Sequence, residues 1–150
     1  MSDKLTQLGH RSETAASPYD ALLERIAVAD GRMLGTVIRL SAPEFTSICP
    51  VTGQPDFATI YVDYVPRNWL IESKSYKLFL GSFRSFGTFH EEAVAIIRDR
   101  LVLALDPVYL RAAAFWYPRG GIPIDVFCPY GRLPANCWAP HLGIPTFRGR

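Results

Sequence analysis

The sequence predicts an α+β protein in which two helices cover one face of a four-stranded antiparallel sheet. Two pairs of segments rich in β-branched and aromatic residues predict the strands, at residues 36–50 and 57–67 and then 108–121 and 122–131. Between the pairs lie two stretches with helical spacing of their apolar residues. At 150 residues and 49% hydrophobic composition, the chain is large enough to bury one real core.

The chain begins with a polar stretch, and we expect a loose arm over residues 1–18 and a single domain over residues 19–150. Residues 17–30 carry leucine, isoleucine and alanine at helical spacing, which predicts a short helix. Ser17 and Pro18 suit its first turn, and Gly31 suits its end.

The strands are predicted by their alternation and by the turns between them. Residues 36–50 contain two prolines and are expected to form a strand that ends in a loop carrying Cys49. Residues 52–55, TGQP, have turn chemistry, and the clearest strand follows at residues 57–67. A shorter strand is expected at residues 69–71.

Two helices and a hairpin complete the expected fold. A helix is predicted from residue 73 onwards and a second one over residues 88–105, where Asp106 and Pro107 stop it. A hairpin should close around the glycines at 120 and 121. The tail from residue 132 is rich in proline and glycine, so we expect irregular structure there.

Charge and hydropathy restrict the partners of the chain. A formal net charge of +2 gives no reason to expect a nucleic-acid or membrane surface. No apolar run approaches the roughly 20 residues of a membrane span, and the first residues lack the apolar core of a secretory signal. We therefore expect a cytoplasmic protein, and the charge leaves its partner open.

Three cysteines are present, and their odd number and wide spacing argue against a disulfide scaffold and a zinc ribbon. Cys49 stands in a loop seven residues before Asp56, where a thiol could act as a nucleophile with a proton partner nearby. The alternative is that Cys49 is a small buried hydrophobic residue and Asp56 a turn former. The roles of Cys128 and Cys137 stay open.

The residues FHEE place His90 and Glu91 at the start of the predicted second helix. There the imidazole could move a proton, and the carboxylate could accept two parallel hydrogen bonds from the guanidine edge of a purine-like ring. The alternative is that both side chains only cap the helix and favour its dipole.

A third cluster is basic. ESKSYKLF offers Ser73, Lys74, Ser75 and Lys77 around a helix start, where they could hold phosphates, and Arg119 stands beside a glycine turn. The chain contains neither a GxGxxG nor a GxxxxGK[ST] motif, so a Rossmann or P-loop site is not supported. The alternative is a solvated basic end of a helix.

Three segments together resemble a known family. SICPVTGQPDFATIYVDYVP, ESKSYKLFLGSFRSFGTFHEE and PRGGIPID are similar, in order and spacing, to the short form of 7-cyano-7-deazaguanine reductase, the QueF-type nitrile reductase. The resemblance covers residues 44–125. It implies the tunneling fold of GTP cyclohydrolase I, in which subunits pair their sheets into an oligomeric barrel with active sites between subunits.

The resemblance also implies roles for individual residues. Cys49 matches the nucleophile that forms a thioimide, Asp56 the proton donor and His90 a second polar catalytic residue. Glu91 matches the carboxylate that anchors the deazaguanine ring. Of the ESKSYKLF segment, Glu72 and Ser73 are assigned to the substrate. Lys74, Ser75 and Lys77, together with Arg119, are assigned to the cofactor.

The implied reaction converts 7-cyano-7-deazaguanine to 7-aminomethyl-7-deazaguanine with two NADPH, in queuosine biosynthesis, without a metal and in a homo-oligomer. Position 93 is alanine where some relatives have a cysteine, so a disulfide that protects Cys49 is not expected. Two alternatives stay open: a zinc-dependent pterin or GTP-ring enzyme of the same fold, and a purine-binding ring without activity.

Overall fold

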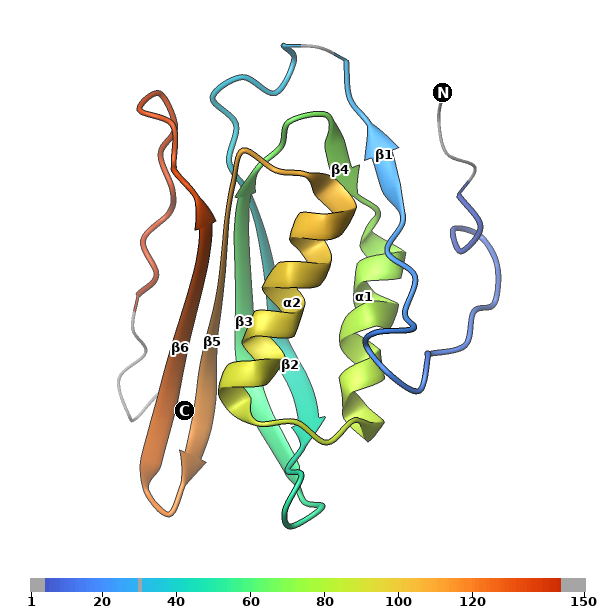
Figure 1. The fold of residues 1–150 in the computed structure, drawn as a ribbon, viewed down its shortest axis with the longest axis vertical. Helices are drawn as coiled ribbons and strands as arrows, with labels where there is room; N and C mark the ends of the chain where they lie inside the picture. Colours follow the sequence, from blue (N-terminus) through green and yellow to red (C-terminus); the bar gives the residue numbers. More distant parts are fainter. Residues whose placement is uncertain (1–4, 30, 144–150) are drawn as a thin grey trace.

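In a computed structural model, which describes residues 5–29 and 31–143, the chain is built around a four-stranded antiparallel sheet. Its strands lie in the order β2-β3-β5-β6, and Figure 1 shows helices α1 and α2 on the same face of this sheet. The predicted α+β architecture is therefore confirmed. The strands are β2 Ile38–Ile48, β3 Pro55–Val65, β5 Tyr109–Arg119 and β6 Ile122–Gly131.

Alternation along β3 fixes which face of the sheet is covered. Ile60, Val62 and Tyr64 are at most 1% exposed and point towards the helices, as residues two apart on a strand must share a face. Their neighbour β5 contributes Trp116, which is fully buried opposite Ala58. This face carries the hydrophobic core of the domain.

The helices bury residues at intervals of three and four. In α2, His90–Leu105, the side chains of Val94, Ile97 and Leu101 are fully buried where the helix packs on β5 and β6. α1, Ser73–Gly81, and the short 3₁₀ helix η1, Ser82–Ser85, lie against β2. α2 ends at Asp106, whose φ of 43° is left-handed, and Pro107 cannot continue the helix.

The helix predicted over residues 17–30 is wrong. The described part of this segment forms only strand β1, Arg25–Ala27, which pairs with β4, Trp69–Ile71, in a separate two-stranded sheet. The Arg100 guanidinium group donates hydrogen bonds to the carbonyl oxygens of Tyr19 and Ala21, which a helix would have used for its own backbone bonds. The predicted end of the helix, Asp30, lies outside the described residues.

The segment before β1 is held by two charged side chains. Residues 5–18 contain no helix or strand, and the Glu24 carboxylate accepts hydrogen bonds from the N–H groups of Thr6 and Gln7. The Lys74 ammonium group donates to the carbonyl oxygens of Gln7 and His10. The described part of the expected arm therefore lies against the start of α1.

The face of the sheet away from the helices carries a buried ion cluster. Asp63 of β3 is fully buried and pairs with Arg39 of β2 and Arg111 of β5, each at 2.7 Å. Both guanidinium groups also donate to the carbonyl oxygen of Pro140 in the tail. Residues 132–143 contain no helix or strand, and the cluster joins them to the sheet; residues 144–150 lie outside the described part.

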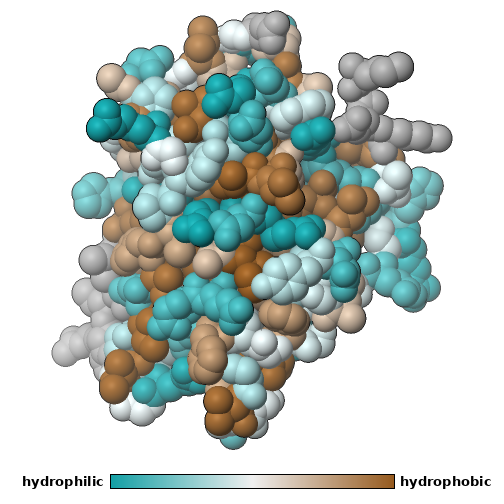
Figure 2. All heavy atoms as spheres, viewed as in Figure 1, coloured by the Kyte–Doolittle hydropathy of each residue, from teal (hydrophilic) through white to brown (hydrophobic). Residues whose placement is uncertain are grey.

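The helix-bearing side has a mixed surface. Figure 2 shows hydrophobic side chains scattered among hydrophilic ones on this side, in keeping with a net charge of only +2. Within the described residues, no helix is both long and apolar enough to cross a membrane.

Replacing Asp63 by asparagine should strongly destabilise the fold, because two arginines lose their shared counter-charge. We expect the free energy of unfolding to fall by about 3 kcal/mol, the low end for a broken buried pair since the guanidinium groups stay partly exposed. Urea denaturation measures this change.

As a matched control, Asp99→Asn removes an exposed pair with Arg98 and should lower the free energy of unfolding by less than about 1 kcal/mol. Equal effects of the two variants would contradict a structural role for the cluster around Asp63.

Candidate active site

Cys49 lies in the turn that joins β2 to β3. Its N–H donates to the Gln54 carbonyl at 2.8 Å, and its own carbonyl accepts from the Gly53 N–H at 2.9 Å. Gly53 has a φ of +68°, which side chains rarely tolerate, so glycine is needed to close this turn. The turn fixes the Cys49 side chain at the end of β2 with 8% of its surface exposed.

The start of α2 is attached to the same turn by the backbone. The Ile48 N–H donates to the Phe86 carbonyl at 3.2 Å, and the Thr88 N–H donates to the Ile48 carbonyl at 3.0 Å. A Cβ atom at Gly87 would lie 3.4 Å from the Cα of Pro50, so this close approach suits glycine. These contacts bring the first turn of α2 next to Cys49.

A cavity of about 170 Å³ opens where these elements meet. It unites five of the predicted site residues from four separate parts of the chain. These are Cys49, Asp56, His90, Glu91 and Arg119. Thr88, Phe89, Pro50 and Ile124 complete its lining.

Asp56 lies between two nitrogen-bearing side chains. Arg119 Nη1 lies 3.1 Å from Oδ1 and 3.2 Å from Oδ2 of this carboxylate, which is buried on the helix side of β3. His90 Nε2 lies 3.2 Å from Oδ2, close enough for an ion pair but without hydrogen-bond alignment. The imidazole stacks on the buried Trp116 ring, with centroids 3.9 Å apart and planes 7° apart, which fixes its orientation.

The surroundings of His90 disfavour its charged form. Burial lowers the pKa of the imidazole, and the Arg119 charge lowers it further, while Asp56 and Glu91 act in the opposite direction. His90 is therefore predominantly neutral at neutral pH and can both donate and accept a proton there.

The surroundings of Cys49, in contrast to those of His90, favour the charged form of the side chain. Hydrogen bonds from the Thr52 hydroxyl, and then from the N–H groups of Thr52 and Val51, lower the pKa of the Cys49 thiol to about 7. Arg119 makes a smaller contribution in the same direction. This thiol therefore ionises more readily near neutral pH than an ordinary cysteine, and the thiolate is the reactive form of the side chain.

The predicted residues at the start of α1 do not line this cavity within one chain. Glu72 instead caps the helix, since its carboxylate accepts the N–H groups of Lys74 at 2.8 Å and Ser75 at 2.7 Å. Ser75 is fully buried and donates to the Glu72 carbonyl, and Lys74 holds the carbonyl oxygens of the preceding segment. Ser73 is exposed on the first turn.

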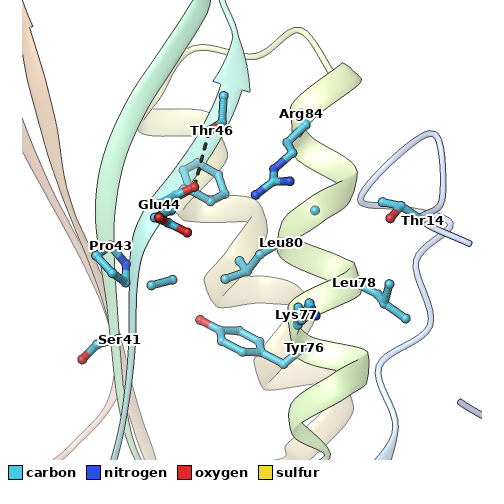
Figure 3. A pocket seen from close by; sticks show the side chains of 13 residues that line it. Thr14, Ser41, Pro43, Glu44, Thr46, Tyr76, Lys77, Leu78, Leu80 and Arg84 are labelled. Carbon is cyan, nitrogen blue, oxygen red and sulfur yellow. Dashed lines mark hydrogen bonds between the residues drawn. The ribbon is translucent and has the colours of Figure 1, made fainter. Parts of the chain in front are cut away.

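Lys77 faces a larger groove, of about 390 Å³, between α1 and β2. Figure 3 shows Arg84 pointing into the same groove, and the Tyr76 hydroxyl, which is buried without a partner among the described residues, also points there. Sequence reasoning missed Arg84. Arg84 lies in η1, seven residues after Lys77. A spacing of about two helical turns favours one side of a helical segment, which is the signal that could have found it.

Substitutions around His90 should shift its pKa in opposite directions. Arg119→Met removes a repelling positive charge and should raise the pKa, whereas Asp56→Asn removes an attracting carboxylate and should lower it further. NMR titration of the imidazole nitrogens measures both shifts. His10, which lies outside the cavity, gives a reference signal that neither substitution should change; two shifts of the same sign would contradict this geometry.

The structure is that of an α+β protein whose cavity brings together a thiol, a carboxylate and an imidazole. The family model described as "QueF-like protein" matches residues 55–135. Two relatives from Rhizobium etli strains CFN 42 and CIAT 652, each named "NADPH-dependent 7-cyano-7-deazaguanine reductase", are 55% identical over 97% of this chain and 94% of theirs. A relative of the same name from Brucella anthropi is 54% identical over the same shares.

The chain therefore belongs to the family of NADPH-dependent 7-cyano-7-deazaguanine reductases. The crystal structure of "the archaeosine synthase QueF-Like in the apo form" is similar with a TM-score of 0.60 and 24% identity, over 65% of this chain and 96% of that one. This likeness shows the shared fold, and it confirms the tunneling fold that the sequence resemblance implied.

Proposed function

We propose that this protein reduces the nitrile of 7-cyano-7-deazaguanine to the aminomethyl group of 7-aminomethyl-7-deazaguanine with two NADPH, in queuosine biosynthesis. The observation that carries the proposal is the cavity in which Cys49, Asp56, His90 and Glu91 meet. Relatives 55% identical over nearly the whole chain have this activity in their names. A cavity used only for binding would not need an ionised thiol.

In the first step the Cys49 sulfur adds to the nitrile carbon. A C–S bond forms, one π bond of the nitrile moves its electron pair to nitrogen, and that nitrogen takes up the proton that the thiol gave up. We assign this transfer to Asp56, which lines the same cavity, with the neutral His90 beside it as a second group able to handle protons. The product is a covalent thioimide, whose C=N carbon is a better acceptor of hydride than a nitrile.

When bound, NADPH supplies the hydride for each of the two reductions. Cys49 must leave the carbon between them, and a thiol with a pKa of about 7 is a good leaving group. Glu91, whose exposed carboxylate stands at the rim of the cavity, can accept two hydrogen bonds from the guanidine edge of the deazaguanine ring. It would orient the nitrile towards Cys49.

The groove beside α1 fits the phosphates of NADPH. Lys77 and Arg84 offer two cationic groups there. Two neighbouring hollows, both lined by Phe57 and Tyr117, lie between this groove and Asp56, and we take them as the path of the cofactor. Arg119 lies where this path reaches the cavity. Lys74 and Ser75 fit the cofactor less well, because both side chains already have partners within the chain.

We further propose a homo-oligomeric barrel with active sites between subunits, in the cytoplasm. β2 and β6 are the edge strands of the four-stranded sheet in the described part of the chain, and edge strands can pair with another copy. In such an assembly the exposed Ser73 of one subunit would serve the substrate of its neighbour, whereas the Glu72 carboxylate fits this role less well because it is buried and caps α1. A reducing compartment suits the reaction because Cys49 must stay a free thiol to act.

The adduct provides the direct test. Incubation with 7-cyano-7-deazaguanine should add one substrate mass to Cys49, and Cys49→Ala should abolish both the adduct and NADPH oxidation. Asp56→Asn should slow turnover by about 10²-fold or more, as expected for loss of a proton-transfer group. Cys128→Ala, which changes a cysteine outside the cavity, is the control and should react normally; an adduct that persists in Cys49→Ala would refute the assignment.

The cofactor groove has its own test. Arg84→Ala should raise the KM for NADPH about tenfold, the usual effect of losing one charge-assisted hydrogen bond, without changing the rate of adduct formation. Steady-state kinetics and the mass measurement separate the two effects. Arg98→Ala, an arginine on α2 that lies outside the groove, is the control; an unchanged KM in Arg84→Ala would exclude this path.

A further inference from the structure

Residues 5–18, the N-terminal segment, border the groove between α1 and β2. Thr14 of this segment lines the groove together with Lys77 and Arg84. Figure 3 shows Thr14 on the side of α1 that faces away from β2. A Cβ atom at Gly81, the last residue of α1, would lie 3.4 Å from Thr14 Cγ2, so the segment lies close against the helix there. The shape of the groove on this side therefore depends on where the segment lies.

Two side chains hold the beginning of the N-terminal segment. The Glu24 carboxylate accepts hydrogen bonds from the N–H and the hydroxyl group of Thr6, each at 2.6 Å, and from the Gln7 N–H at 3.2 Å. The Lys74 ammonium group donates to the carbonyl oxygens of Gln7 and His10. The segment contains no helix or strand, so its position depends on side-chain contacts of this kind.

Lys74 and Lys77 stand three residues apart on α1 and have different surroundings. Lys74 is half-buried, and two of its three N–H donors bind the N-terminal segment. Lys77 is exposed, and of these two lysines it is the one found among the described residues that line the groove. Ser75 joins Lys74 in holding the segment, because its hydroxyl oxygen accepts the Glu24 N–H at 3.0 Å. The first turn of α1 and Glu24 thus hold the segment as one unit.

We propose that Lys74 is a positioning residue for the cofactor, which promotes NADPH binding by holding the N-terminal segment at the groove rather than by contacting a phosphate. The inference rests on the proposed function in taking this groove as the site of NADPH. A segment held by a few polar contacts opens locally, and a ligand that touches only the closed form favours that form. Because Thr14 lines the groove, NADPH there meets the closed segment. Such coupling is reciprocal, so bound NADPH also orders the segment.

Hydrogen exchange of the free protein, followed by mass spectrometry, measures the segment directly. Lys74→Met should speed exchange in a peptide that contains Thr6 and Gln7. These N–H groups donate to Glu24 and not to Lys74, so faster exchange would show that the segment is released as a whole. Saturating NADPH should slow exchange of the same peptide in the wild type. Lys77→Met is the matched control and should leave exchange in the free protein unchanged.

The fluorescence of NADPH, recorded without substrate, measures the Kd. Lys74→Met should raise the Kd about fivefold, the low end of ordinary coupling between linked sites. Glu24→Met releases the same segment from outside the groove and should have a similar effect. The double variant should also lose about fivefold, because both substitutions act through one segment. Lys74→Arg, which can still donate to two carbonyl oxygens, should keep the Kd of the wild type.

Thermal unfolding and sizing check that the variants fold and assemble; if Lys74→Met does not, Glu24→Met still releases the segment. Unchanged exchange in Lys74→Met, or effects on the Kd that add in the double variant, would overturn the role of Lys74. A wild type that binds no NADPH would overturn the cofactor groove and, with it, this role. The two failures are distinguishable, because additive effects require a wild type that binds NADPH.

Discussion

The candidate active site depends on two backbone hydrogen bonds that Ile48 makes with the segment before α2. They join the end of β2 to the start of a helix some forty residues later in the chain, and Gly87 allows the two backbones to approach. Without this contact Cys49 and His90 would belong to unrelated parts of the domain. Backbone bonds suit this purpose because they fix position without using the side chains that the chemistry needs.

Within the cavity Arg119 acts on both titrating side chains, His90 and Cys49. Asp56 pairs with Arg119, and the same guanidinium group disfavours a proton on His90 and favours the thiolate of Cys49. Burial and this cation together favour the neutral imidazole, and the cation makes a small contribution to the thiolate. The Trp116 ring beneath His90 excludes water from one side and keeps these interactions strong.

The sequence predicted most of the fold because the relevant signals are local. Alternation predicted β3, and apolar spacing predicted α2, since each of these elements buries one face on the core. The segment at residues 17–30 has helical spacing too, yet it pairs with β4 and gives its carbonyl groups to Arg100. Such partners are distant in the chain, so local periodicity cannot reveal them.

The contrast between local signals and partners that are distant in the chain applies to the candidate active site as well. Cys49 and Asp56 belong to one short motif, so the resemblance to a family identified them directly. The contact of Arg119 with Asp56 depends on the register in which β5 pairs with β3, and the sequence does not reveal that register. Glu72 and Lys74 show the converse, because a motif assigned them to ligands while their geometry gives them partners at the start of α1.

The outer edge of β2 borders the groove proposed for the cofactor and is also an edge at which a second copy could pair. Pro43, Glu44 and Thr46 of β2 line both the groove that holds Lys77 and Arg84 and the hollow next to it. They lie at or beside the bulge where the pairing of β2 with β3 shifts between Ala42 and Phe45. A bulge at Pro43 turns part of the edge away from regular pairing and widens the space beside it. A second copy that paired with β2 would therefore border the groove as well as extend the sheet. In the proposed barrel, a single contact along β2 would both assemble the subunits and complete the site.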